Sequence, residues 1–200
     1  QLLDQLSLLV DKSLVVALET STEGGMRYSL LETVRQYAQE KLGESGEAEE
    51  TRTRHRDYYT ATAAQLASQG LAGVARLLAW ARAESDNLRA AFAWSLDSSD
   101  RESALRLASS LQEFWLRTGV FREALAAFDA VLTERRPEEI APSVWVRAIA
   151  DQCTIAGWAG SYGHTDLAYE ALEVARNVDD AALIARALGA CGIATFYNAE

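Results

Sequence analysis

The chain has 200 residues, enough to bury a sizeable core, and 49% hydrophobic with 24% charged residues is typical of a soluble globular protein. Its net charge of −10 argues against direct binding to DNA, because DNA-binding proteins neutralise phosphates with Lys and Arg. No apolar stretch is long enough to span a membrane and no signal segment opens the sequence, so we expect a cytoplasmic protein with no membrane partner.

The first 46 residues have the pattern of a small winged-helix unit. Leucines recur at helical spacing over residues 2–10, and strand-like segments at about 14–19 and 26–30 enclose a glycine turn. A second helix should begin at a capping box formed by Ser29 and Glu32 and end at Gly43, a residue suited to a left-handed C-cap. The order is therefore helix, two-stranded wing, helix.

Residues 47–98 are predicted to form a helical linker whose first helix spans 47–68. Three arginines surround His55 and could form a phosphate site, whereas acids one turn away favour a solvated charge lattice over a packed histidine. A second polar cluster precedes the next apolar stripe and contains two carboxylates, an amide and a guanidinium. Because no nucleophile, His or glycine-rich loop accompanies it, we expect helix caps and interhelical hydrogen bonds from Glu84, Asp86, Asn87 and Arg89.

Residues 99–200 repeat a helical hairpin pattern. A capping box at Ser99 and Glu102 starts one long helix, and Gly119 ends it. Gly119 and Gly163 are each followed five positions later by alanine and nine positions later by a bulky apolar residue. The hairpins resemble tetratricopeptide (TPR) units, although their 44-residue spacing exceeds the ~34 of a standard repeat. We expect an open, TPR-like superhelical array, with a third unit beginning near Asp180.

Several stretches resemble a known family in the right order along the chain. They are DQLSLLVDKSLV at 4–15, RYSLLETVRQYAQEKLGESGE at 27–47, Arg54-His55 with Tyr58 and Tyr59, and ESDNLRAAFAWSL at 84–96. They resemble the winged-helix portion that closes the nucleotide-binding (NB-ARC) domain of bacterial STAND ATPases, above all large LuxR-family transcriptional regulators of actinobacterial type. The resemblance implies that ATP or ADP binds to an upstream domain of a longer protein, while this fragment holds no cofactor of its own.

The resemblance also implies one nucleotide contact. Related NB-ARC proteins have a Met-His-Asp triplet at the start of the second helix, and matching the next two leucines places it on Arg27, Tyr28 and Ser29. The phenol of Tyr28 can donate one hydrogen bond to a phosphate but cannot carry the charge of a histidinium, which Arg27 could supply. Alternatively, Tyr28 is a strand residue that packs on the first helix.

The helical array also contains candidate residues for binding a partner. Stacked hairpins generate a concave groove, and aromatic side chains supply large contact areas within it. The alternative is that these aromatics pack between helices. The candidates are Trp115, Trp145, Trp158, Tyr162 and Tyr169.

Motifs of enzymes and metal sites are missing from the sequence. Lys12 and Lys41 each follow an acid, so there is no phosphate loop, and neither histidine has an HExxH partner. The stretch AGSYG at 159–163 lacks the first glycine of a nucleophile elbow. Cys153 and Cys191 lack CxxC spacing, and we expect them to be buried and reduced. We therefore predict no catalytic residue and no metal ligand.

Two functional hypotheses remain. Because the sequence starts and stops inside amphipathic patterns, we expect a fragment of a longer chain. In the first hypothesis it is the regulatory part of a signalling ATPase and transcriptional regulator. Its array would receive a protein partner or small-molecule inducer, and its winged helix would pack on the protein's own upstream nucleotide-binding domain. In the second it is a free-standing TPR-like scaffold that binds a peptide or protein.

Overall fold

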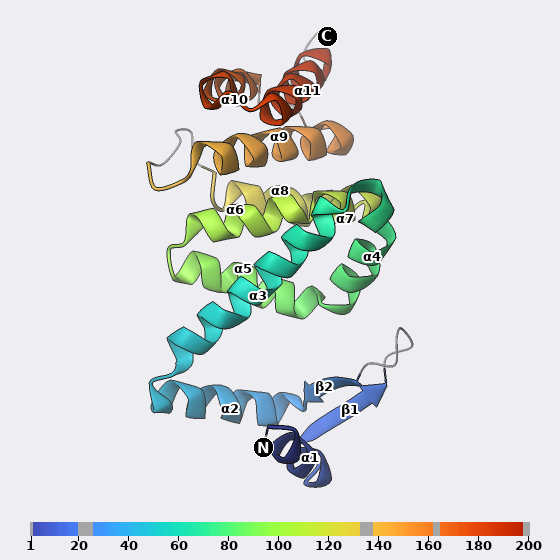
Figure 1. Cartoon of the computed structure of the whole chain (residues 1–200), viewed down its shortest axis with the longest axis vertical. Helices are drawn as coiled ribbons and strands as arrows, with labels where there is room; N and C mark the ends of the chain where they lie inside the picture. The colour runs from blue at the N-terminus through green and yellow to red at the C-terminus, as the bar shows by residue number, and fades with distance from the viewer. Residues whose placement is uncertain (1, 20–25, 133–137, 162–164, 198–200) are drawn as a thin grey trace. The chain divides into compact units, whose positions relative to one another are not determined.

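The computed structural model describes residues 2–19, 26–132, 138–161 and 165–197. Within these ranges the chain forms eleven α-helices and one two-stranded antiparallel sheet (Figure 1). It divides into two compact units, residues 1–51 and 52–200. The predicted fold class is confirmed: mainly α, with a helix–strand–strand–helix unit followed by a helical array. The predicted functional division at residues 46 and 98 stays a prediction.

The N-terminal unit is built around the short hairpin. Helix α1 (Leu2–Asp11) packs against β1 (Val15–Glu19), which pairs with β2 (Met26–Leu30), and α2 (Glu32–Ser45) follows. The register joins the first residue of β1 to the last residue of β2. Both strands lie where the sequence predicts them, because the apolar run and its β-branched residues favour a strand over a helix. The predicted glycine turn lies outside the described residues.

The two predicted ends of α2 are wrong. Ser29 lies in β2 opposite Val16, so strand pairing holds it away from the capping position. Leu31 occupies that position, and its side chain makes no capping hydrogen bond. At the other end the helix continues through Gly43 and ends before Gly46, which has a left-handed φ of 77°. A glycine is tolerated inside a helix, and a second one lay three residues further on to provide the left-handed cap.

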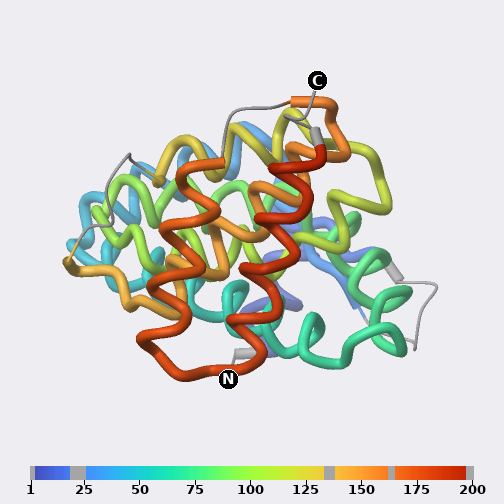
Figure 2. Tube along the Cα trace, turned by 90° about the horizontal axis from the view of Figure 1, so that it is seen from above, coloured from blue at the N-terminus to red at the C-terminus, as the bar shows by residue number. Residues whose placement is uncertain are grey.

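The second unit is a stack of helices. Its lower layers in Figure 1 contain α3 to α5, the next α6 to α8, then α9, and last α10 with α11. Figure 2 shows α10 and α11 running side by side, and the two helices contact each other and α9. The bounds are α3 (Ala48–Ser68), α4 (Gly70–Ala83), α5 (Ser85–Asp97), α6 (Arg101–Ser110), α7 (Gln112–Thr118), α8 (Phe121–Asp129), α9 (Pro142–Ala159), α10 (Thr165–Val178) and α11 (Ala181–Tyr197).

Helix α9 is the centre of this unit. Pro142 stands in its first turn, where a missing N–H costs nothing, and Gly160 closes it with a φ of 69°. It contacts α6, α7 and α8 on one side and α10 and α11 on the other. Trp145, Ile149 and Ile155 are fully buried along its length. An apolar helix covered on both sides is expected to be hydrophobic nearly all round, as α9 is.

The hairpin pattern is visible in the packing. The two predicted alanines, Ala124 and Ala168, have no exposed surface, and their bulky partners Phe128 and Leu172 are also buried. Gly119 has the left-handed φ of 72° expected at a helix end, and Gly163 lies outside the described residues. Small residues at these positions let neighbouring helices approach closely, which is the packing that the repeat pattern predicts.

The start and the continuity of the first predicted hairpin helix need correction. Asp100, not Ser99, caps α6, and its carboxylate accepts from the backbone N–H of Ser103 at 3.0 Å. Glu102 instead accepts from the backbone N–H of Ala141 at 2.8 Å, a contact 39 residues away that no local pattern could indicate. The predicted single helix also breaks at Leu111 into α6 and α7.

The structure also bears on the predictions for the two cysteines and for a membrane span. Cys153 and Cys191 are both buried, reduced thiols, and burial raises the pKa of the Cys153 thiol to about 12. Such a thiol stays protonated and unreactive. Among the described helices, none is both long and apolar enough to cross a membrane.

Candidate functional site

The two candidate nucleotide contacts lie in the hairpin. Arg27 pairs with Leu18 and Tyr28 with Ala17, so both residues belong to β2 and not to the start of α2. This is the strand predicted at 26–30, and it agrees with the alternative that Tyr28 is a strand residue. Successive strand residues point to opposite faces, so Arg27 and Tyr28 do not share one. Tyr28 is 42% exposed, and its contact with a nucleotide stays a prediction.

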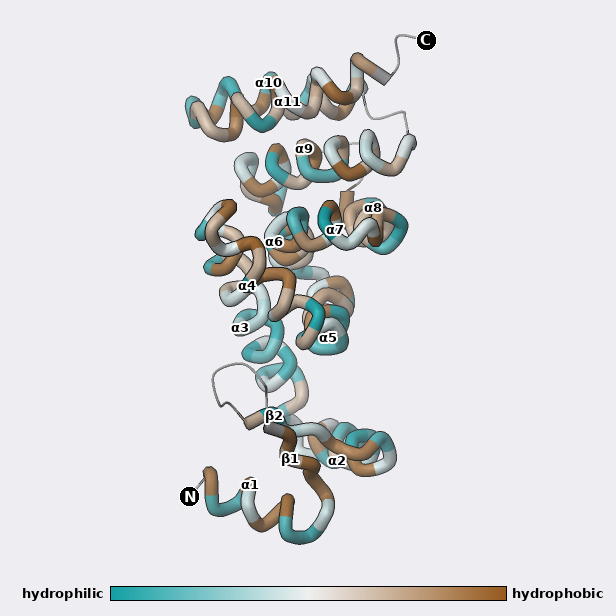
Figure 3. The backbone as a smooth tube through the Cα atoms, turned by 90° about the vertical axis from the view of Figure 1, so that its right-hand side faces the viewer, coloured by the Kyte–Doolittle hydropathy of each residue, from teal (hydrophilic) through white to brown (hydrophobic). Residues whose placement is uncertain are grey.

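Most of the large apolar side chains described in the N-terminal unit are exposed. Among the described side chains of residues 1–51, Val15 is the only buried one. Figure 3 shows hydrophobic residues along α1 and β1. Groups of exposed apolar side chains mark surfaces that other proteins or domains cover. The large apolar residues that remain exposed are Leu3, Leu8, Leu9, Leu14, Val16, Leu18, Met26, Tyr28, Leu30, Leu31 and Tyr37.

The five aromatic candidates fall into different environments. Trp145 is fully buried and Trp115 is 6% exposed, with its ring 5.9 Å from that of Phe128. Both pack in the core of the array and offer no surface to a partner. Trp158 is 71% and Tyr169 49% exposed, so these two can contact one. Tyr162 lies outside the described residues.

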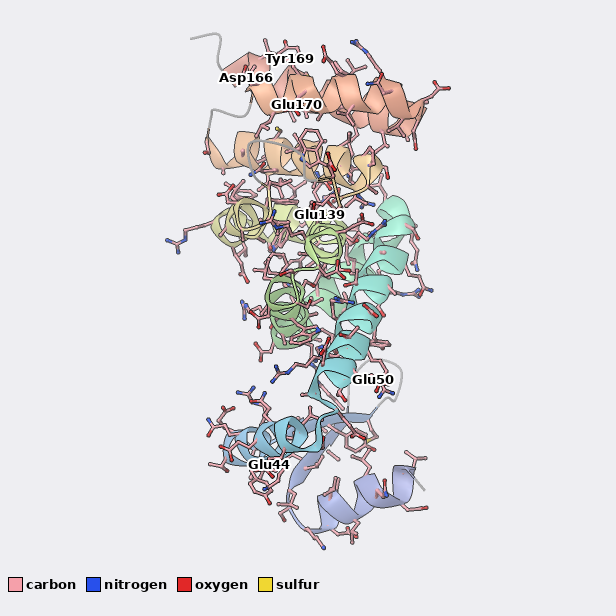
Figure 4. All side chains as sticks on the ribbon, turned by 90° about the vertical axis from the view of Figure 1, so that its left-hand side faces the viewer. Glu44, Glu50, Glu139, Asp166, Tyr169 and Glu170 are labelled. Carbon is pink, nitrogen blue, oxygen red and sulfur yellow. The ribbon has the colours of Figure 1, made fainter. Side chains whose placement is uncertain are left out.

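Tyr169 stands in an acidic setting. Figure 4 shows Asp166 and Glu170 beside it on α10. Its hydroxyl lies 3.3 Å from the hydroxyl of Thr195 on α11, which ties the two helices together at this point. A partner that contacts Tyr169 would therefore meet two carboxylates and an aromatic ring.

The polar cluster before α5 makes interhelical hydrogen bonds, as the sequence analysis expects. The hydroxyl of Tyr59 and the amide of Asn87 donate to the same oxygen of Glu84, at 3.0 and 2.6 Å. Nε2 of His55 lies 3.4 Å from the amide oxygen of Asn87, and its ring packs against that of Tyr59 in a tilted arrangement with the ring centres 4.6 Å apart. These contacts join α3 to α5, and they leave His55 a packed residue.

Around His55 the contacts of Arg56 favour the charge lattice over a phosphate site. Arg56 is 8% exposed, and its guanidinium contacts Asp57 and Asp100 at 2.8 Å each. Two carboxylates already balance its charge, so an anion would have to displace one of them.

Sequence reasoning missed one buried charge. Asp151 on α9 has no exposed surface, and Nε of Arg186 on α11 donates to it at 2.7 Å. Arg147 lies 3.6 Å away, and Arg186 also donates to Gln112 on α7 at 2.7 Å. Burial raises the pKa of Asp151, while Arg186, Arg147 and the hydroxyl of Ser109 oppose this rise. The only sequence signal was an acid inside the apolar run IADQCTIAG.

The fold is a helical array preceded by a winged-helix-like unit. Three relatives, two from Mycobacterium tuberculosis and one from Mycobacterium bovis, are named HTH-type transcriptional regulators. Each is 50% identical over 205 residues, which cover 99% of this chain and 23% of the relative. The chain is thus related to transcriptional regulators and spans about a quarter of their length. No protein-family pattern matches it, and no solved structure does.

These names contradict one prediction. The sequence analysis excluded DNA as a partner, whereas the relatives are named as HTH-type regulators of transcription, a class that acts on DNA. The error lies in the use of net charge, which is a sum over the whole chain. Contacts with phosphates are made locally, by individual basic side chains.

Proposed function

We propose that this chain is the signal-receiving and signal-transmitting segment of an HTH-type transcriptional regulator. The support is its 50% identity, over 99% of its length, to proteins with that name. In those relatives the matching region is 23% of the protein, which favours a segment of a larger regulator over a free-standing scaffold.

The N-terminal unit is proposed to dock on a nucleotide-binding domain of the STAND type. The observation that carries this proposal is the exposure of the apolar side chains in residues 1–51. Among the described side chains of this unit, Val15 is the only buried one. An isolated unit of this size with so little core needs another surface to cover it. Bound ATP or ADP would then alter that contact, with Tyr28 and Arg27 as candidate nucleotide ligands.

The helical array is proposed to receive the signal. Trp158 at the end of α9 and Tyr169 on α10 are exposed and available to a protein partner. Helix α9 contacts α6, α7 and α8 on one side and α10 and α11 on the other, so a displacement of the last helices would reach the earlier ones through it.

The experiment uses the full-length regulator and a reporter gene under a promoter that it controls. Leu8→Asp places a charge on the exposed apolar surface of α1, where Leu8 is 52% exposed, and we expect a several-fold change in reporter output. Gln5→Asp is the matched control, because it adds the same charge to an exposed polar position of the same helix. Both variants should keep the melting temperature of the wild type. Equal output from wild type, variant and control would contradict the proposal.

A further inference from the structure

A pocket of about 410 Å³ opens between α5 and the helices α6 to α8. Its volume lies within the range of about 300–1,000 Å³ that small-molecule sites in proteins occupy. Residues of five successive helices, α4 to α8, line the pocket, so it belongs to the array itself and not to one loop. The large apolar side chains of its wall are Leu88, Phe92, Leu107, Leu111, Phe114 and Trp115.

The pocket stays open because one of its walls is made of small residues. Ala126 and Ala127 on α8 face the space opposite Phe92 and Leu96 on α5. At its edge, Leu96 and Val120 remain 36% and 38% exposed. Covering these two side chains would stabilise a bound apolar molecule, by about 25 cal/mol for each Å² removed from water.

Polar groups gather at one place in the lining. Ser85, Arg89 and Glu123 are its only polar members, and Nε of Arg89 donates to Glu123 at 3.0 Å across from α5 to α8. These two side chains are 62% and 46% exposed, so water screens the pair. A ligand can therefore open this pair at little cost.

The charges at this place are unequal. Arg89 also contacts Asp86 at 3.4 Å, so one guanidinium stands beside two carboxylates. A cationic head group could form an ion pair with Glu123 while Arg89 stays paired with Asp86. A carboxylate head would instead compete with both acids, in a chain whose net charge is −10.

We propose that this pocket binds an amphiphilic amine, with its apolar body among the side chains of α5 to α8 and its ammonium group at Glu123. The inference goes beyond the proposed function and does not depend on it. Binding is measured on the 200-residue chain alone, whereas the regulatory role is measured by transcription in the full-length protein.

The test compares three probes that share a ten-carbon chain: decylamine, decanol and decanoate. Isothermal titration calorimetry of the wild type should give the tightest binding for decylamine and the weakest for decanoate, with about tenfold between them. Glu123→Gln should remove the preference for the amine. Glu113→Gln, at a comparable ion pair with Arg117, is the matched control and should keep it.

A second pair of variants tests the location. Ala126 and Ala130 are both exposed on or just after α8, but only Ala126 lines the pocket. Ala126→Trp should fill the space and abolish binding of all three probes, while Ala130→Trp should bind them like the wild type. Binding by Ala126→Trp at wild-type strength, or no binding of any probe to the wild type, would overturn the pocket. Equal affinity for the three probes would overturn the assignment of the head group.

Discussion

Asp151 is a buried carboxylate that connects helices of the array. It is fully buried on α9, yet it binds Arg186 of α11, which in turn binds Gln112 of α7. Three helices that lie far apart in the sequence are thereby joined through one carboxylate. Removing a single partner of a buried charge is costly, so this network restricts how the helices can pack.

The pH dependence of stability tests this carboxylate. Burial raises the pKa of Asp151 above its ordinary 3.8, so the folded state holds the proton more tightly than the unfolded state does. Its contribution to stability is therefore full below the unfolded pKa and is lost as pH rises through the folded pKa. Asp151→Asn cannot lose stability in this way. The free energy of unfolding of the variant minus that of the wild type should therefore increase as pH rises.

Urea unfolding at a series of pH values above 3.8 measures this difference. Asp97→Asn is the control, since Asp97 is exposed at the end of α5, and its difference from the wild type should not change in the same way. A wild type that gains stability over Asp151→Asn with rising pH would show that the arginines outweigh burial.

Tyr28 provides a test of the nucleotide contact. In the full-length protein, Tyr28→Phe should weaken ADP binding, because it removes the only hydrogen-bond donor of the side chain. The side chain is 42% exposed in β2, so we expect the melting temperature to stay close to that of the wild type. Titration with ADP and thermal unfolding measure the two effects. Unchanged ADP affinity together with a lower melting temperature would make Tyr28 a structural residue.

Among the elements, α9 contains both a fully buried and a mostly exposed tryptophan. Trp145 lies near its start with no exposed surface, and Trp158 lies at its end with 71% exposed. The two residues have the same chemistry but different surroundings, since buried residues occur along the helix as far as Gly157 and Trp158 follows them. One helix therefore contributes side chains both to the core and to the surface.

Truncation of each tryptophan should give very different results. Trp145→Ala leaves a cavity and should lower the free energy of unfolding by about 3–5 kcal/mol. Trp158→Ala removes an exposed side chain and should change it by no more than about 0.5 kcal/mol. Denaturant unfolding of both variants provides the comparison. Similar losses for the two would mean that the end of α9 is as well covered as its start.

At the scale of the whole molecule, the two units differ in how they are stabilised. One contiguous apolar core runs through residues 52–200, from Ala63 on α3 to Cys191 on α11. Residues 1–51 contribute no described side chain to that core. The array should therefore fold by itself, while the N-terminal unit is marginal without a covering surface.

Fragments test this difference. Residues 47–200, which keep the whole of α3, should melt cooperatively at a temperature close to that of the full chain. Residues 1–46 alone should bind a hydrophobic dye and show no cooperative transition, because they lack a core. Circular dichroism and dye fluorescence measure both. A large drop in the melting temperature of the longer fragment would mean that the first unit stabilises the array.

Local chemistry was enough to predict the type of several elements of this protein. The apolar run at 14–18 indicated a strand, Gly119 marked a helix end, and the spacing of Ala124 and Phe128 indicated the buried face of a hairpin. Backbone geometry and the period of apolar residues depend on neighbours within a few positions, so the sequence by itself determines them.

The tertiary structure decided which residues serve as surface, cap or site. Ser29 lost its predicted capping role to strand pairing, and Glu102 bonds to Ala141 across 39 positions. Periodicity gave Trp145 and Trp158 the same status, and only the contacts of α9 separated them. Asp151 with Arg186, and the pocket between α5 and α8, exist because helices distant in the sequence lie side by side. The free energy of such contacts depends on burial and distance in space, which the order of residues along the chain does not contain.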